Sequence, residues 1–509
     1  MDKNTKLAFL LIALIIIFYP YFLPEEKEVQ TSKPGEDTFQ DARKEASEVI
    51  DPKEDRPEIK HQAEKTVPDT ALFVAETKDI NIETDLYKAV LSTKNGAFKS
   101  WKIKKYKSRV DTSKLVELIQ EGTSNLHTEI SLKNSIVLEN TVYETDEENV
   151  FLTGEGKTKN IMLTCKDSLG KTLYTKKFRF YSDKYSFDLS IDTSPIFDKL
   201  ADDKAVAVKW PNGIKFTEVS DSGKNMNRED YYRETYVKRG EELIDFDDND
   251  ESISVEGEIE WGATRSKYFE VFFVSEEESF SAFMNYPAHD EVDSHYTSMG
   301  FMTVFDKGST EVKDMFVYLG PMDYEIFKSY DKEFELTMNW GWDIIKPFSL
   351  AIYWTLKFLH NYIDNYGLVI IILSLIVNTL VLPFTLKSFK SQAAMKKVQP
   401  EMKLIKEKYK NDLQKQQQAT MELYKKHNVN PLGTCIPTLL PMPILYGMFI
   451  VFGATIEFRG AEFVLWINDL SLPEIMFTLP FSVRKWPSGR PTSVMLNRRT
   501  GLHWQGTDN

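Results

Sequence analysis

Cysteine is nearly absent from this chain, which has only Cys165 and Cys435 among its 509 residues. This excludes a disulfide-dense scaffold and a cysteine-rich zinc site. The two cysteines fall in segments that we expect to face different compartments, so we predict no disulfide between them. Basic residues are also in deficit, since 63 Lys and Arg stand against 77 Asp and Glu for a net charge of −14. Such a chain is poorly suited to neutralise phosphates, and we expect no specific binding of nucleic acid.

The motifs of soluble enzymes are missing as well. The sequence has no phosphate-binding loop, no Gly-rich dinucleotide turn, no His-Glu-x-x-His and no nucleophile elbow. We therefore predict that the protein is not an enzyme and uses no cofactor.

Two polar clusters have the spacing of metal ligands, but in both a surface loop is the favoured interpretation. One fits a calcium loop except that Asp250 stands where that loop needs glycine, and its members are Asp245, Asp247, Asn249 and Glu256. The other has zinc-ligand residue types in a polar stretch after Pro287, and its members are His289, Asp290, Glu291, Asp293 and His295. We predict no metal at either.

Apolar residues are concentrated in a few long runs. The first covers residues 7–23 after Lys3 and Lys6, and 17 residues at about 1.5 Å each give about 25 Å, the short end of a membrane span. No small-x-small cleavage site follows, so residues 1–24 are predicted to be a retained signal anchor rather than a cleaved signal peptide. The preceding lysines place the N-terminus in the cytoplasm. Residues 25–69 are acidic and poor in large apolar side chains, which is typical of a flexible linker.

Residues 70–335 have a different texture. Short alternating runs are separated by turn signals such as Asn95-Gly96, and helical periodicity is scarce. This pattern predicts a large antiparallel β-sandwich on the extracytoplasmic side of the membrane.

Further apolar segments follow this predicted domain. Residues 341–365 place Lys357, His360 and Asp364 on one helical face, which favours an amphipathic helix in the outer membrane–water interface over a buried helix. Residues 367–386 carry no charge over about 30 Å of helix, which predicts a transmembrane helix. A second transmembrane helix is predicted over residues 431–456, followed by an extracytoplasmic segment over residues 457–481.

The loop between the two predicted spans, residues 387–427, is strongly basic. It carries eleven lysines against four acids, a net charge of +7, and such loops stay in the cytoplasm. Apolar residues at three- and four-residue steps predict a helical hairpin with one apolar stripe; they are Met395, Val398, Met402, Ile405 and Tyr409. The favoured interpretation is that the stripe packs one arm on the other while the lysines bind anionic lipid. The stripe can also contact a ribosome or nascent chain, with Met395, Met402 and Tyr409 as candidate contacts.

Polar residues and prolines interrupt the predicted spans. Ser374 and Asn378 share one helical face at mid-membrane depth, where polar side chains either join helices or line a cavity, and joining is favoured. Pro437, Pro441 and Pro443 each remove a backbone hydrogen bond that lipid cannot replace, so the second span must pack on neighbours or line a hydrated cavity.

Short motifs recur through this part of the chain: KSFKS at 387–391, QP at 399–400, QQQ at 416–418, MELYKK at 421–426, VNPLGTCIP at 429–437, MP at 442–443, IEFR at 456–459 and WINDLS at 466–471. Together they resemble the YidC-type membrane protein insertases of the YidC/Oxa/Alb superfamily. Upstream, WG at 261–262, KYF at 267–269 and YLGP at 318–321 are similar to marks of the family's extracytoplasmic domain in Gram-negative bacteria.

The resemblance implies a multi-domain protein of the bacterial inner membrane. Its parts would be an all-β periplasmic supersandwich, akin to sugar-binding folds, and an α-helical transmembrane bundle with a cytoplasmic helical hairpin. Such insertases work without nucleotide on nascent membrane proteins, alone or beside the Sec translocon, through a hydrophilic groove. The groove positions correspond to Asn378, Ser374 and Met442. Where this chain has Asn378 the family usually has Arg or Lys, and a neutral amide can hydrogen-bond a substrate but cannot attract its acidic residues.

The chain departs from the family pattern after Phe481-Ser482. The family continues with three more spans, whereas residues 482–509 are basic without an apolar run. We favour a non-native tail, from a frameshift or truncation, over a genuine shortened variant. We also expect weak or absent insertase activity, because half of the groove wall would be missing. The alternative function is an anchored β-sandwich that binds a glycan or envelope partner. A transporter has no support from an intramembrane acid or an inverted repeat.

Overall fold

The computed structural model describes residues 76–134, 136–218, 229–246, 254–275, 280–286, 298–410, 412–427, 441–465, 467–472, 492–497 and 501–506. The expected signal anchor, the linker, the cluster from His289 to His295 and the motif with Cys435 and Pro437 lie outside these residues. Cys165 is buried as a free thiol. Of the calcium-like cluster, Asp245 and Glu256 are described and lie in strands of two different sheets.

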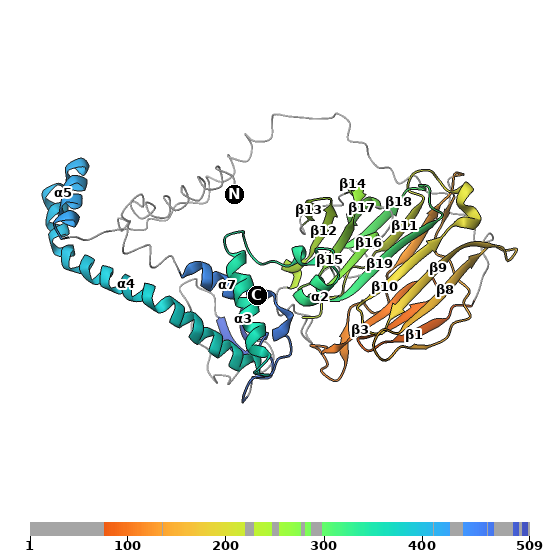
Figure 1. Ribbon diagram of the computed structural model, residues 1–509, viewed down its shortest axis with the longest axis horizontal. Helices are drawn as coiled ribbons and strands as arrows, with labels where there is room; N and C mark the ends of the chain where they lie inside the picture. The colour runs from red at the N-terminus through yellow and green to blue at the C-terminus, as the bar shows by residue number, and fades with distance from the viewer. Residues whose placement is uncertain are drawn as a thin grey trace. The chain divides into compact units, whose positions relative to one another are not determined.

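Three β-sheets make up the first part of the described chain (Figure 1). The five-stranded sheet has the order β4-β3-β2-β1-β7; its strands are β1 (Asp79–Glu83), β2 (Tyr87–Ser92), β3 (Ala97–Lys107), β4 (Leu115–Glu117) and β7 (Val150–Phe151). The eight-stranded sheet has the order β13-β12-β15-β16-β19-β10-β9-β8; its strands are β8 (Thr158–Lys166), β9 (Thr172–Tyr181), β10 (Ser186–Asp192), β12 (Glu234–Arg239), β13 (Glu242–Phe246), β15 (Trp261–Arg265), β16 (Phe269–Ser275) and β19 (Val312–Pro321).

The six-stranded sheet has the order β14-β17-β18-β11-β5-β6. Its strands are β5 (His127–Ser131), β6 (Val137–Leu138), β11 (Val206–Trp210), β14 (Ser254–Ile259), β17 (Phe280–Tyr286) and β18 (Gly300–Phe305). Among the described strands, only β1 and β7 pair in parallel. The antiparallel sandwich expected from the alternating runs is therefore confirmed.

One continuous, aromatic-rich core holds these sheets together. The ring of Phe98 lies edge-on to Trp101 at 5.1 Å and packs against Phe187 at 5.2 Å between centroids. Where β15 approaches β17, a Cβ on Gly262 would lie 2.0 Å from the ring of Phe283, so only glycine permits this spacing between sheets. Aromatic pairs of this kind add about 0.5–1.5 kcal/mol each beyond the area that they bury.

Helices follow the sheets. They are α2 (Tyr324–Ser329), η5 (Phe334–Thr337), α3 (Lys346–His360), α4 (Tyr366–Lys408), α5 (Leu413–Lys426), α7 (Met442–Ala454) and η6 (Ile456–Phe458), and two short helices, η2 (Ser194–Lys199) and η3 (Glu229–Tyr232), lie among the strands. The β-sandwich followed by a helical part is the fold class expected from the sequence.

The longest helix, α4, has 43 residues and includes both Pro383 and Pro400. Asn365 caps it by accepting a hydrogen bond from the N–H of Leu368 at 3.1 Å. Its stretch Tyr366–Leu386 is, within the described chain, the one helix long and apolar enough to cross a membrane. The helix does not end where the lysines begin, so the first arm of the hairpin continues the apolar stretch directly. Helix α7 has 13 residues, and the preceding residues 431–440 of the expected second span lie outside the described chain.

Helix α3 packs on α7 rather than standing alone. Ser349, Ile352, Tyr353 and Leu356 are its buried residues, and a Cβ on Gly447 of α7 would lie 3.1 Å from the backbone nitrogen of Ser349. The other side of α3 is aromatic and exposed, with Trp354 and Phe358 at 51% and 59%, and Tyr362, two residues after the helix, is 76% exposed.

Near the end of the chain, β20 (Thr492–Asn497) pairs with β21 (Gly501–Gly506) as an antiparallel hairpin.

Candidate functional site

The three expected groove residues lie on two helices. On α4, Ser374 is half-buried and Asn378 is exposed, whereas Leu373 and Val377 belong to the core that includes helix α3. Met442, the first residue of α7, is 56% exposed. Among the described residues, no hydrogen bond or ion pair joins Met442 to Ser374 or Asn378. The structure therefore puts the two polar side chains on one helix and does not bring Met442 into polar contact with them.

The hairpin formed by the end of α4 and by α5 has its own small core. Val398 of α4 and Leu423 of α5 are buried in it, and Ala394, Met395, Met402 and Ile405 pack around them. The hydroxyl of Tyr424 donates to the sulfur of Met402 at 3.3 Å. Tyr409 lies at the end of α4, outside this core. The apolar stripe thus packs one arm of the hairpin against the other, which is the interpretation favoured from the sequence. Contact of Met395, Met402 and Tyr409 with a ribosome or nascent chain remains a prediction.

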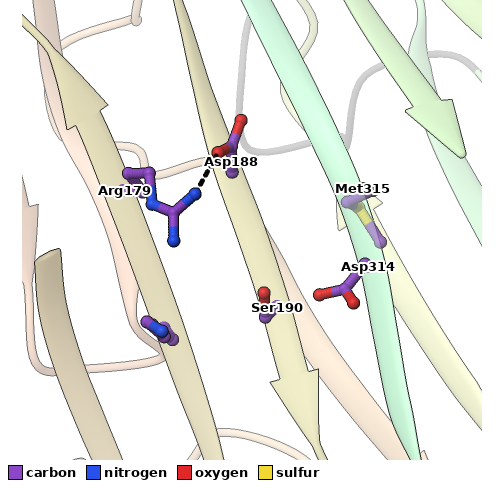
Figure 2. Close-up of a pocket in the computed structure, with 6 residues that line it drawn as sticks. Arg179, Asp188, Ser190, Asp314 and Met315 are labelled. Carbon is purple, nitrogen blue, oxygen red and sulfur yellow. Dashed lines mark ion pairs between the residues drawn. The ribbon is translucent and has the colours of Figure 1, made fainter. Parts of the chain in front are cut away.

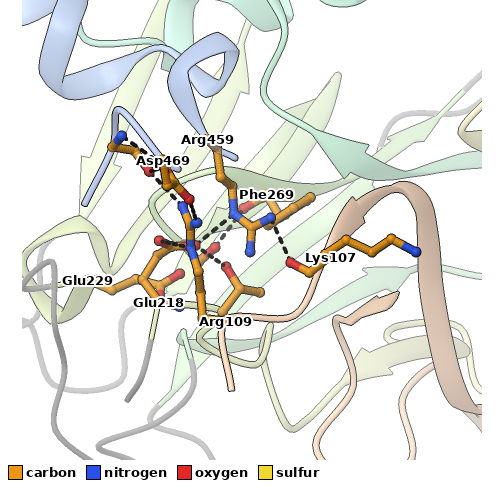
Figure 3. A network of polar contacts seen from close by, with 10 residues as sticks. Lys107, Arg109, Glu218, Glu229, Phe269, Arg459 and Asp469 are labelled. Carbon is orange, nitrogen blue, oxygen red and sulfur yellow. Dashed lines mark hydrogen bonds and ion pairs between the residues drawn. The ribbon is translucent and has the colours of Figure 1, made fainter. Parts of the chain in front are cut away.

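A buried ion network joins the β-sandwich to the segment after α7 (Figure 3). Glu218, which follows β11, accepts from Nε of Arg459 at 2.7 Å and from Nε of Arg109 at 2.8 Å. Arg109 also pairs with Asp469 and donates to the hydroxyl of Ser471 at 2.6 Å. Four charged side chains, two of each sign, therefore form one chain of contacts between residues about 110 to 360 positions apart.

The network is almost dry. The side chains of Glu218, Arg459 and Arg109 are 0%, 2% and 7% exposed. Arg459 also donates to the carbonyl oxygen of Lys107 at 3.1 Å, and its guanidinium lies 5.6 Å from the ring centroid of Phe269. Burial of a guanidinium requires this degree of pairing, because an unpaired buried charge is strongly unfavourable.

The titration of these groups follows from burial and charge. Burial would raise the pKa of Glu218, but attraction and hydrogen bonds from Arg459 and Arg109 outweigh it and lower that pKa. Burial lowers the pKa of the Arg109 guanidinium. Glu229, whose carboxylate accepts from the backbone N–H of Glu218 at 2.8 Å, has its pKa raised to about 8 by burial and by the charge of Glu218. Beside the ionised Glu218, the network therefore holds a second glutamate, Glu229, whose pKa is raised rather than lowered.

The segment after α7 also contacts the helices. Glu457 accepts from the hydroxyl of Tyr353 at 3.1 Å and lies 3.5 Å from Nζ of Lys357, both on α3. The side-chain amide of Asn365 donates to the carbonyl oxygen of Phe463 at 3.1 Å. Residues 456–465 and 467–471, which we call the outer segment, thus bind the β-sandwich, α3 and the start of α4 together.

Comparison with known families and proteins decides the relationship. The family described as "YidC periplasmic domain" matches residues 79–351, and the family described as "60Kd inner membrane protein" matches residues 358–487. The membrane protein insertase YidC of Chloroherpeton thalassium is 31% identical over 504 residues, which cover 95% of this chain and 83% of that protein. That of Geobacter sp. strain M21 is 32% identical over 80% of this chain and 74% of that protein.

The chain belongs to the YidC family of membrane protein insertases. The resemblance expected from the motifs is confirmed. The expected location in the bacterial inner membrane, with a periplasmic domain, is confirmed with it.

The YidC-family sequence motifs gave a partial signal for the ion network. Arg459 ends the IEFR motif and Asp469 lies in the WINDLS motif, so two of its four charges stood in segments already singled out. Arg109 and Glu218 lie in connections between strands, where no pattern in the sequence marked them.

A polar pocket lies on the eight-stranded sheet of this YidC-family domain (Figure 2). It has a volume of about 200 Å³ and is lined by Lys177, Arg179, Asp188, Ser190, Asp314 and Met315. Nη1 of Arg179 lies 3.7 Å from Oδ2 of Asp188, so part of the charge of Arg179 is already neutralised within the sheet. Small-molecule sites are lined mainly by apolar and aromatic side chains, and this lining has neither aromatic ring nor apolar floor beyond Met315. The pocket gives no support to the alternative of a glycan-binding anchor.

Proposed function

We propose that this chain acts as a membrane protein insertase, with nascent membrane proteins as substrates and without a catalytic step. Family membership supports the activity, and the position of Ser374 and Asn378 on the apolar stretch of α4 supports the groove. Their polar groups would replace part of the hydration that a polar substrate segment loses when it enters the membrane.

We also propose the membrane topology expected from the sequence. Residues 1–24 and 431–456 would span the bilayer in addition to Tyr366–Leu386, with the basic hairpin in the cytoplasm. The exposed lysines of that hairpin would bind anionic lipid, and the Sec translocon and the ribosome are the proposed protein partners.

In this proposal Asn378 binds substrate by hydrogen bonds and not by charge. Its exposed amide has no hydrogen-bond partner within the described chain, so it is available to a substrate segment. A neutral amide discriminates little between acidic and neutral polar segments, because it offers no net charge to either.

Insertion of radiolabelled substrates into proteoliposomes tests this role. Replacing Asn378 with Leu should slow insertion of a substrate with a polar translocated segment about fivefold, the effect of about one lost hydrogen bond. Replacing it with Arg should speed insertion only where that segment is acidic. Thr379→Val is the matched control, because the Thr379 hydroxyl already donates to the carbonyl of Leu375 at 2.8 Å within the helix. Equal rates for Asn378→Leu and Thr379→Val would refute the proposed groove role.

A further inference from the structure

A polar cavity lies where the β-sandwich, α3, the start of α4 and the outer segment meet. Its volume is about 370 Å³, and its lining includes Lys105, Asp323, Lys357, Tyr366, Glu457 and Arg459. Tyr366 is the first residue of the apolar stretch that is long enough to cross the membrane. Since the periplasmic domain precedes that stretch, the cavity lies level with the outer membrane–water interface.

Two deeply buried side chains of opposite charge contribute to this cavity. Arg459 is 2% exposed at its side chain, and its second terminal nitrogen, Nη2, has no hydrogen-bond partner within the described chain. Glu457 is 7% exposed and pairs with Lys357. A buried guanidinium nitrogen without a partner is unfavourable, so an added acceptor such as a phosphate oxygen would be favoured there once a small shift of the lining opens the way to this covered nitrogen.

The rim of the cavity also carries both positively and negatively charged side chains. Lys105 is exposed and makes no ion pair with the described residues, and its Nζ lies 5.6 Å from the ring centroid of Tyr106. Asp364 and Glu462 are also exposed lining residues without an ion pair in the described chain. The lining thus offers donors for an anion and carboxylates for a cation within one site.

The neighbouring face of α3 is suited to the apolar part of a lipid. Trp354 and Phe358 are exposed on it and Tyr362 is exposed just after the helix, and aromatic side chains of this kind concentrate at membrane–water interfaces. An acyl chain could lie along these rings while its headgroup occupies the cavity.

We propose that this cavity binds the headgroup of a zwitterionic aminophospholipid of the phosphoethanolamine type. The phosphate contacts Lys105 and the guanidinium of Arg459, and the primary ammonium contacts Asp364 and Glu462. The excess of carboxylates in the lining disfavours a purely anionic headgroup. This site is separate from the groove on α4, and its occupation does not depend on insertase activity.

Native mass spectrometry of the full chain, released from nanodiscs of mixed phosphatidylethanolamine, phosphatidylglycerol and phosphatidylcholine, tests the proposal. The expected result is retention of phosphatidylethanolamine above the other two lipids. Lys105→Gln and Asp364→Asn should each lower that retention about fivefold, as expected for loss of one exposed ion pair worth up to about 1 kcal/mol. Both residues are exposed, so these variants should fold normally.

The controls are Lys346→Gln and Asp343→Asn, which remove exposed charges near the start of α3 without touching the cavity. Competition distinguishes the possible ligands, because soluble glycerophosphoethanolamine should displace the lipid whereas inorganic phosphate should not. Displacement by inorganic phosphate alone, preference for phosphatidylglycerol, or equal losses in the control variants would each overturn the proposal.

Discussion

Replacing Glu218 with Gln should release the outer segment from the β-sandwich. The Glu218 carboxylate is fully buried and accepts charge-assisted hydrogen bonds from both Arg459 and Arg109. A glutamine has one acceptor oxygen instead of two, and its NH₂ group would face guanidinium donors. The variant therefore leaves two buried positive charges with weaker partners.

The magnitude follows from the remaining contacts. Removing one partner of a buried ion pair costs about 3–5 kcal/mol. Arg109 keeps Asp469 and Arg459 keeps the carbonyl of Lys107, so we expect the lower end, about 3 kcal/mol, which corresponds to a roughly 100-fold shift in the opening equilibrium.

Hydrogen exchange of the full chain in nanodiscs measures this shift. Amides of the outer segment should exchange roughly 100-fold faster in Glu218→Gln, while those of β9 and β10 keep their wild-type rates. Glu242→Gln is the control, because Glu242 and Arg239 form an exposed pair at 2.8 Å and its loss should change exchange little.

A double-mutant cycle with Arg459→Gln then isolates the pair. If the two substitutions add within about 0.5 kcal/mol, Glu218 and Arg459 are not coupled and the reasoning fails. The sign of the pH dependence gives a second check. Because the folded pKa of Glu218 is lowered, its stabilisation is complete above the ordinary carboxyl pKa and is lost as pH falls through the lower folded value.

Three further predictions concern other parts of the chain. Burial raises the pKa of Glu270 to about 8, so the folded state holds a proton that the unfolded state loses above about pH 4.3. The free energy of unfolding, measured by chemical denaturation, should therefore fall as pH rises from 5 to 8. The variant Glu270→Gln should flatten that profile. A Cβ on Gly367 would lie 2.0 Å from the ring of Phe463, so Gly367→Ala should destabilise the outer segment by about 1–3 kcal/mol in hydrogen exchange, whereas Gly453→Ala, with nothing within 4 Å, should not. Leu423→Ala should destabilise the hairpin by about 2–5 kcal/mol and increase its proteolysis, while unchanged proteolysis would contradict the small core described there.

The elements that the sequence predicts well are those set by local patterns. Alternation of apolar and polar residues is enough to identify strands. In the basic segment 387–427, apolar residues spaced three and four positions apart are enough to identify a helical hairpin whose apolar stripe packs internally. Asn365, the residue before α4, caps it through its own side chain, and this too is a local effect. In contrast, the continuity of α4 through Lys387 was missed, because a change from apolar to basic residues alters the preferred solvent without weakening the helix.

The buried ion network was beyond sequence reasoning for a different reason. Glu218 and Arg459 are 241 positions apart, and nothing in the local sequence of either specifies the other. Many other acidic and basic residues of the chain are equally plausible partners on sequence grounds. Only the packing of the sandwich against the outer segment selects this pair. The groove assignment of Ser374, Asn378 and Met442 has a similar basis, since it came from the resemblance and remains a prediction.

The unbroken course of α4 has a mechanical consequence. About 22 residues of the helix lie beyond Leu386, with Pro400 among them, and they extend about 33 Å at 1.5 Å per residue. If the apolar part tilts by about 10°, well within the range of membrane helices, the tip near Lys408 sweeps about 6 Å. The predicted substrate position at Asn378 and the hairpin tip are then coupled through one helix, and bending at Pro383, which lacks a backbone N–H, would weaken that coupling.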